Sequence, residues 1–411
     1  MTQRHLADLS TVSVRAIRDL ELDQTRSPRR ETVRLLADAL RLTGPRRAAL
    51  EQAAVSTGEW LAGDLVPPPA PLSPLLGRER DVSSLVTLLE SSGHRMITAV
   101  GVAGVGKTRL GQEVAVQLHL RGRIPAVWLD HDERVPPAPH RASPDRLGAG
   151  LRVLLRGEPV LDELAHAVGD TRISLIVVGT NLDRTVQNRL RMLLLRCPGL
   201  RVLCESREAP AEPSSTVFPV LPLAVPEWQF GVAETDPARY PALQLLLSQY
   251  EQLRPDAAVD HEIATALAGI CWYLDGIPTA LESVAPWMLL YDPVRLLDMT
   301  RRDPLRLIAQ RAETGTGLTE ALRGTVCALE PWDAEVLRRL AAVRRPWTLE
   351  QALERIGDSL VTSVNRIYAL CTRGLVRPVE PAGGGEQRFT VLNLVRCLLA
   401  ADGVPALERH A

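Results

Sequence analysis

The chain has 411 residues, 45% of them hydrophobic, with a formal net charge of −1 at pH 7. This length predicts two to four domains with ordinary globular cores. A membrane span and a secretory leader are not expected, because no apolar run reaches 18 residues and the N-terminus lacks a signal pattern. The six cysteines include no C-x-x-C pair, which indicates reduced thiols in a cytoplasmic protein and no zinc site.

Residues 1–66 are expected to form a small helical domain. The pattern predicts helices over Gln3–Ser10, Val14–Leu22, Arg30–Leu42 and Arg46–Val55. Ser13 can cap the second helix, because its hydroxyl can accept a hydrogen bond from an unpaired backbone N–H. The first two helices have helix-turn-helix spacing, in which the second helix lies in the major groove of DNA.

The candidate DNA-binding residues lie on these helices and on the loop that follows them. Residues 1–50 carry ten arginines against six acidic residues, a modest basic excess that suits nucleic acid. The alternative is a helical bundle that binds another protein. The predicted DNA contacts are Gln3, Ser13, Arg15, Arg18, Arg29 and Arg30.

Residues 67–74 are proline-rich, which predicts an extended spacer between domains. The strand Met96–Val100 follows, then a loop that fits G-x-x-x-x-G-K-[ST], then a helix from Lys107. Such a loop turns its backbone N–H groups onto phosphates. Lys107, the sole lysine of the chain, would reach the β- and γ-phosphates, and the Thr108 hydroxyl would ligate Mg²⁺. The sequence therefore predicts an ATP or ADP site with Mg²⁺.

Strand and helix patterns alternate over residues 75–225, which predicts an α/β domain with a parallel sheet and helices on both faces. The other predicted strands are Ala126–Leu129, Ile173–Val178, Leu200–Cys204 and Val217–Leu221, and the helices include Asp81–Ser91, Lys107–Leu120, Pro159–Val168 and Arg184–Arg196. Residues 226–310 have a helical pattern. Residues 311–411 are mixed, with a hairpin candidate near Leu375–Thr390.

Two resemblances follow from these motifs. The segment from Thr2 to Leu40 resembles the phage-repressor-type helix-turn-helix of actinobacterial regulators, although the chain begins at that family's second helix and Thr11 replaces a usual glycine. The remainder resembles the NB-ARC-type nucleotide switches of the signal-transduction ATPases with numerous domains. That likeness is carried by Leu75–Glu79, the P-loop, Cys204-Glu-Ser-Arg207, Leu221-Pro-Leu223, Gly276-Ile-Pro-Thr-Ala280 and Arg388–Arg396.

The second resemblance implies a nucleotide held between a P-loop domain, a helical lid domain and a winged-helix domain. Arg207 would report the γ-phosphate, since a guanidinium is always charged and can bind two oxygens. Without the family context, the alternative for Arg207 is a surface arginine at the end of a strand. The implied nucleotide-binding residues are Leu76, Arg78, Gly101, Gly104, Val105, Gly106, Lys107, Thr108, Arg109, Arg207 and Pro278.

The chain departs from that family at the end of the strand Ile173–Val178. An aspartate that orients Mg²⁺ is expected there, and the residue is Gly179. Asp183 and Asp130 are nearby carboxylates but are out of register. Leu392 stands where plant and animal relatives carry a histidine. These departures predict a protein that binds ATP or ADP and hydrolyses it slowly or not at all.

The sequence thus favours a nucleotide-controlled transcription regulator that binds DNA through its N-terminal helices and can form homo-oligomers. The alternative is an NTPase, or a nucleotide-dependent assembly scaffold, whose N-terminal helices bind a protein partner.

Overall fold

The computed structural model describes most of the chain between residues 2 and 401. The described residues are 2–21, 30–44, 47, 69, 71, 73–91, 93–121, 125–130, 151, 154–155, 157, 161–170, 172–178, 184–207, 215–229, 232–233, 236–309, 317–379 and 386–401. The predicted helix Arg46–Val55, apart from Arg47, and residues 67, 68, 70 and 72 of the proline-rich spacer lie outside them.

Three N-terminal helices form a cluster of their own: α1 (Gln3–Ser10), α2 (Val14–Glu21) and α3 (Arg30–Ala39). Val12, Ile17 and Leu36 make its buried core. Thr11 ends α1 in the left-handed conformation, at φ 58°. This conformation favours glycine, which is the residue the resemblance leads one to expect in this turn.

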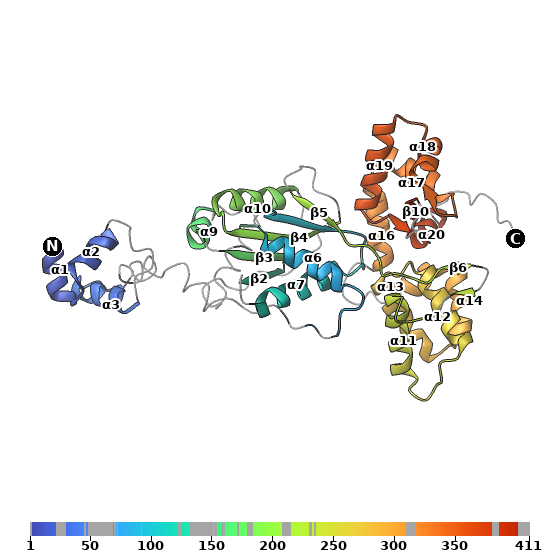
Figure 1. Cartoon of the computed structure of the whole chain (residues 1–411), viewed down its shortest axis with the longest axis horizontal. Helices are drawn as coiled ribbons and strands as arrows, with labels where there is room; N and C mark the ends of the chain where they lie inside the picture. Colours follow the sequence, from blue (N-terminus) through green and yellow to red (C-terminus); the bar gives the residue numbers. More distant parts are fainter. Residues whose placement is uncertain are drawn as a thin grey trace.

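A parallel five-stranded sheet lies at the centre of the chain, in the order β2-β3-β4-β1-β5. Its side chains alternate between two cores, because successive residues of a strand point to opposite faces. Helices α6 and α7 contribute to one core, and α9 and α10 to the other (Figure 1). The bounds are β1 Met96–Val100, β2 Ala126–Asp130, β3 Ile173–Val178, β4 Leu200–Ser206, β5 Thr216–Pro219, α6 Glu79–Glu90, α7 Lys107–Arg121, α9 Leu161–Val168 and α10 Arg184–Arg196.

A helical module follows the sheet, as predicted, and it includes one feature that was not predicted. A short hairpin of β6 (Trp228–Gln229) and β7 (Val232–Ala233) packs on α12, where a Cβ at Gly269 would come within 2.7 Å of the Trp228 ring. Two-residue strands carry too little period-two pattern to be recognised. The helices are α11 Pro241–Leu253, α12 His261–Tyr273, α13 Pro278–Val284, η1 Ala285–Leu289, α14 Pro293–Arg302 and α15 Pro304–Ile308.

The C-terminal module combines helices with a three-stranded antiparallel sheet in the order β8-β10-β9. The predicted hairpin is present as β9 and β10, and β8 adds a third strand beside β10. The bounds are α16 Leu318–Cys327, α17 Pro331–Ala341, β8 Trp347–Thr348, α18 Leu349–Ile356, α19 Leu360–Thr372, β9 Val376–Val379, β10 Arg388–Val391 and α20 Asn393–Ala401.

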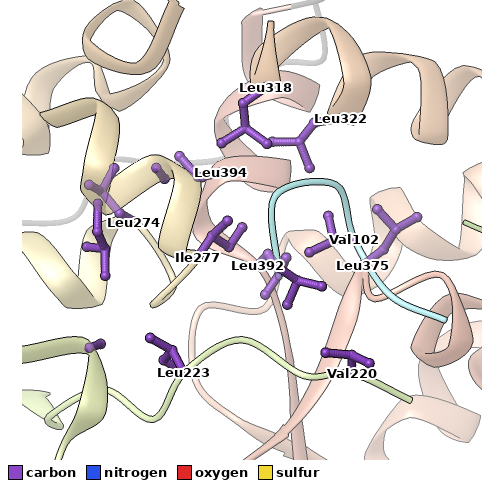
Figure 2. Packing of buried hydrophobic residues seen from close by; sticks show 14 of the residues in the cluster. Val102, Val220, Leu223, Leu274, Ile277, Leu318, Leu322, Leu375, Leu392 and Leu394 are labelled. Atoms are coloured by element: carbon purple, nitrogen blue, oxygen red, sulfur yellow. The ribbon is translucent and has the colours of Figure 1, made fainter. Parts of the chain in front are cut away.

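One continuous apolar cluster joins the sheet to the two modules that follow it. It contains Val102 from the loop after β1, Ile277 from the helical module, and Leu375 and Leu392 from the C-terminal module (Figure 2). Within the described part of the chain, no helix combines the length and the apolar character that crossing a bilayer requires. The fold is therefore a mixed α/β arrangement in which three modules meet at the glycine-rich loop.

Candidate functional site

The glycine-rich loop connects β1 to α7 with a backbone that glycine permits. Gly104 and Gly106 have φ values of 75° and 97°, in the region that other residues enter at a cost. A Cβ at Gly101 would lie 2.5 Å from the Val220 carbonyl oxygen, so this position requires glycine for space as well. The strand, loop and helix that the motif predicted are all present.

The Lys107 ammonium donates to carbonyls of the loop itself. Its Nζ lies 2.8 Å from the Gly101 oxygen and 3.1 Å from the Val102 oxygen. Burial lowers the pKa of Lys107 to about 8; Glu205 opposes this shift, and Arg207 adds to it. Lys107 and Arg207 are thus close enough for their charges to interact.

Thr108 has an acidic partner that sequence reasoning missed. Its hydroxyl donates to Glu205 Oε2 at 2.8 Å, and Glu205 is only 5% exposed near the end of β4. The sequence signal that could have identified this partner is the carboxylate of Glu205, which directly follows the predicted apolar strand Leu200–Cys204. Nothing local showed that β4 lies beside β1, which is what brings Glu205 to the loop.

Two other predicted arginines bind backbone carbonyls. Arg78, 6% exposed, donates to the carbonyl oxygens of Val105 and Leu221 and pairs with Asp81. Arg109 donates to the Ser73 carbonyl and lies 3.8 Å from a Glu113 carboxylate oxygen. Arg78 therefore fixes the loop at its far side, and Arg109 fixes the segment before α6. Leu76 is half-buried in that same segment.

The N-terminus of α13 covers the loop from the helical module. The Thr279 N–H donates to the Gly104 carbonyl at 3.3 Å. A Cβ at Gly104 would come within 2.9 Å of both Thr279 Cβ and Leu318 Cδ1. Pro278, a predicted nucleotide contact, is half-buried at the first position of α13. The structure thus brings Gly104 and the Pro278–Thr279 turn together.

The C-terminal module reaches the same loop through Gly374, which follows α19. Gly374 has φ 73°, and a Cβ there would lie 2.5 Å from the Val102 backbone nitrogen. Leu375 and Leu392 are fully buried beside it (Figure 2). Leu392 thus contributes apolar packing.

Asp275 joins the helical module to the C-terminal module. Its two carboxylate oxygens accept from the Asn393 and Leu394 N–H groups, each at 2.9 Å, at the start of α20. Burial raises the pKa of Asp275 to about 6, against the opposing effects of Arg377, Arg396 and these two N–H groups. The neighbouring Gly276 accepts a hydrogen bond at its carbonyl oxygen from the Leu223 N–H, beyond the end of β5.

The predicted DNA contacts on α2 face outward. Arg15 and Arg18 are exposed, and Ser13 Oγ accepts from the Ala16 N–H, which is the predicted cap. Gln3 donates to Glu21 from α1. Arg29 and the Arg30 side chain lie outside the described residues, so their role stays a prediction.

Of the carboxylate positions considered from the sequence, Gly179 and Asp183 also lie outside the described residues. The side chain of Asp130 is outside them as well. Among the described residues, no group of three or more histidine, cysteine or acidic side chains could hold a metal ion. All six cysteines are free thiols.

Comparison with known proteins gives distant relatives, and no family model matches the chain. An uncharacterised protein of Mycobacterium tuberculosis is 26% identical over 270 residues, which are 65% of this chain and 62% of the relative. A second relative in that organism carries the provisional name of an HTH-type transcriptional regulator. It is 25% identical over 259 residues, 60% of this chain and 27% of its own length. The match therefore spans less than two thirds of either relative.

Two solved structures illustrate the low overall similarity that the structural comparison finds. One is a signal-transduction ATPase with a tetratricopeptide repeat sensor from Pyrococcus horikoshii, with a TM-score of 0.33 and 14% identity over 82% of this chain and 45% of that one. Another is AMPPCP-bound DnaA from Aquifex aeolicus, with a TM-score of 0.32 and 14% identity over 72% of this chain and 87% of that one.

Proposed function

We propose that this protein is a nucleotide-controlled transcription regulator. It binds ATP or ADP with Mg²⁺ at the Gly101–Thr108 loop, and DNA through α1 and α2, in the cytoplasm. The observation that carries the proposal is the convergence of two further modules on the loop. Thr279 donates to Gly104, and Gly374 lies against Val102. A phosphate group bound by the loop therefore changes the contacts of both modules.

Such a site suits a switch because ligands shift a conformational equilibrium only through differential contacts. In the described arrangement the Lys107 ammonium binds loop carbonyls, and α13 and Gly374 pack on the same loop. A nucleotide whose phosphates draw Lys107 away from Gly101 and Val102 alters this packing. The packed arrangement and a more open one would then differ in their affinity for ATP and ADP.

The oxygen chemistry near Thr108 fits a magnesium ion, which prefers hydroxyl and carboxylate oxygens. Thr108 would hold it, and the ion would neutralise charge on the phosphates. We further propose that hydrolysis is weak or absent, since Gly179 stands where the family has its aspartate. The NB-ARC and winged-helix assignments belong to this proposal. They are supported by the order of the motifs and by the three-stranded sheet after α17.

Two measurements test the nucleotide part. Purified protein should contain ADP or ATP after denaturation, and Lys107→Ala should reduce that content strongly. Absence of nucleotide, with no binding in titration, contradicts the proposal. Turnover faster than about one per second that disappears in Lys107→Ala would contradict weak hydrolysis and indicate an enzyme.

The DNA part is tested with Arg15→Ala and Arg18→Ala, using Arg34→Ala as the matched control. Arg34 is an exposed arginine on α3, outside the predicted contacts. We expect salt-dependent DNA binding that weakens in the two α2 variants and persists in the control. Nucleotide-dependent oligomers without DNA affinity would instead favour the assembly scaffold.

A further inference from the structure

The end of β4 carries a buried carboxylate that meets the P-loop hydroxyl. Glu205 pairs in register with Ala99 of β1, and its Oε2 accepts from Thr108 Oγ1 at 2.8 Å. It is 5% exposed, whereas Thr108 is exposed. Burying a carboxylate is costly unless it is paired and hydrogen-bonded, so its place beside Thr108 and Lys107 requires an explanation.

In P-loop proteins the loop threonine and an acidic residue from a neighbouring strand hold Mg²⁺ together. In this chain the position after β3 that would supply the acid is Gly179. The sheet order β3-β4-β1 puts β4 directly beside the P-loop strand, and the strand register places Glu205 one residue beyond the Val177–Cys204 pair. Neighbouring strands are about 4.8 Å apart, so β4 is one strand spacing closer to β1 than β3 is.

The hydrogen bond also orients the threonine for metal binding. A hydroxyl has one hydrogen and two lone pairs. When Thr108 donates its hydrogen to Glu205, both lone pairs remain free to face a cation at the exposed side of the loop. A glutamine or threonine in place of Glu205 would lack the negative charge that attracts such a cation.

We propose that Glu205 is the magnesium-positioning carboxylate of this site, and that it replaces from β4 the acid missing after β3. This inference rests on the proposed nucleotide binding and names a residue that acts through Thr108. Glu205 retains Mg²⁺ without supplying a second acid to activate water. The site therefore binds nucleotide in a metal-dependent manner, while hydrolysis stays slow.

The competing explanation is that Glu205 only neutralises Lys107, whose pKa it raises. The two roles differ in their metal dependence. A neutralising carboxylate affects nucleotide affinity equally with and without Mg²⁺. A metal-positioning carboxylate affects it only when Mg²⁺ is present.

The test measures ADP affinity of the full chain by titration, in Mg²⁺ and in EDTA, for wild type and Glu205→Gln. Glutamine keeps the size of the side chain and can still accept from Thr108. The control is Glu90→Gln at the end of α6, where Glu90 faces Arg121 at 3.5 Å. Circular dichroism establishes that each variant is folded.

We expect wild type and the Glu90 variant to bind ADP more tightly in Mg²⁺ than in EDTA. Loss of an outer metal partner weakens metal affinity by about 10–100-fold, so Glu205→Gln should bind ADP more weakly in Mg²⁺ while its ADP affinity in EDTA is preserved. An equal loss in both buffers overturns the inference and leaves the proposed function intact. No ADP binding by wild type in either buffer overturns the proposed function itself.

A second measurement needs no variant and can overturn the inference even if Glu205→Gln does not fold. Wild-type protein is labelled with ¹³C at glutamate carboxylates and loaded with ADP and Mn²⁺. Electron–nuclear double resonance should detect a ¹³C coupling from a carboxylate near the metal. Absence of any such coupling contradicts the placement of Glu205 at the ion.

Discussion

Asp275 caps the helix that begins at Asn393, although the two residues are 118 positions apart in the chain. A helix N-terminus has unpaired N–H groups, and a carboxylate that accepts from them is favourable to the helix and its dipole. Here the cap comes from a different module. The same turn of chain contacts Leu223 through Gly276 and the P-loop through Thr279. Asp275–Thr279 therefore links the loop, the exit of the sheet and α20.

Removing this cap should loosen the C-terminal module. In Asp275→Ala the N–H groups of Leu394, which is buried, and Asn393, which is partly buried, lose their acceptor. A buried group left unpaired costs about 1–3 kcal/mol. We expect a lower unfolding temperature and faster proteolysis between the modules. The measurements are thermal unfolding and limited proteolysis followed by mass spectrometry.

The matched control is Asp260→Ala, because Asp260 caps α12 within one module by accepting from the Ile263 N–H at 2.8 Å. It should cost about 0.5–2 kcal/mol and leave inter-module cleavage unchanged. Equal proteolysis of both variants would argue against Asp275 as a link between modules.

Stability should also depend on pH through Asp275. Burial raises its pKa from 3.8 to about 6, so the folded state favours the protonated form. The contribution of this raised pKa to the free energy of unfolding is fully present below pH 3.8, and it is lost as pH rises through about 6. Wild type should therefore lose about 1 kcal/mol between pH 5 and pH 7 through this group.

The check is urea unfolding at pH 5 and pH 7 for wild type and Asp275→Asn. Asparagine does not titrate. The free energy of unfolding of wild type, relative to that of Asp275→Asn, should therefore be lower at pH 7 than at pH 5 by that amount. Arg377 and Arg396 oppose the upward shift of the Asp275 pKa, and Arg396, whose own pKa burial lowers to about 10, remains charged throughout this range. A pH-independent difference would show that Asp275 does not titrate in this window.

The contact between Gly374 and Val102 offers a direct way to disturb the packed arrangement. Gly374→Ala places a methyl group 2.5 Å from a backbone nitrogen of the P-loop, which must then shift. Gly357 has the same φ of 73° and open space around it, so Gly357→Ala reports the backbone cost alone, about 1–2 kcal/mol.

We expect Gly374→Ala to destabilise the protein by a further 1–3 kcal/mol, about the cost of overpacking, and to release bound ADP faster. Thermal unfolding and release of a fluorescent ADP analogue measure the two effects. If both alanine variants behave alike, the C-terminal module does not restrain the loop.

The sequence predicted the elements that depend on local pattern and missed the pairings that depend on topology. β1, β3 and α10 have the bounds that periodicity indicated, because apolar spacing and the glycine-rich loop are local signals. The Thr108–Glu205 and Asp275–Leu394 hydrogen bonds join residues 97 and 119 positions apart. Their formation requires the strand order and the packing of modules, neither of which a one-dimensional pattern contains.

Lys107 permits a test that few proteins allow, since it is the only lysine in 411 residues. Its pKa of about 8, lowered mainly by burial, leaves about half of the amine unprotonated at pH 8, where an ordinary lysine has under about 1%. An amine-selective reagent should therefore modify Lys107 with a midpoint near pH 8, and ADP with Mg²⁺ should protect it.

Peptide mass spectrometry separates this product from the modified N-terminal amine. In Glu205→Gln the midpoint should fall, because Glu205 raises the pKa of Lys107. A wild-type midpoint near 10.5 would mean that Lys107 is solvated and not held against the loop carbonyls.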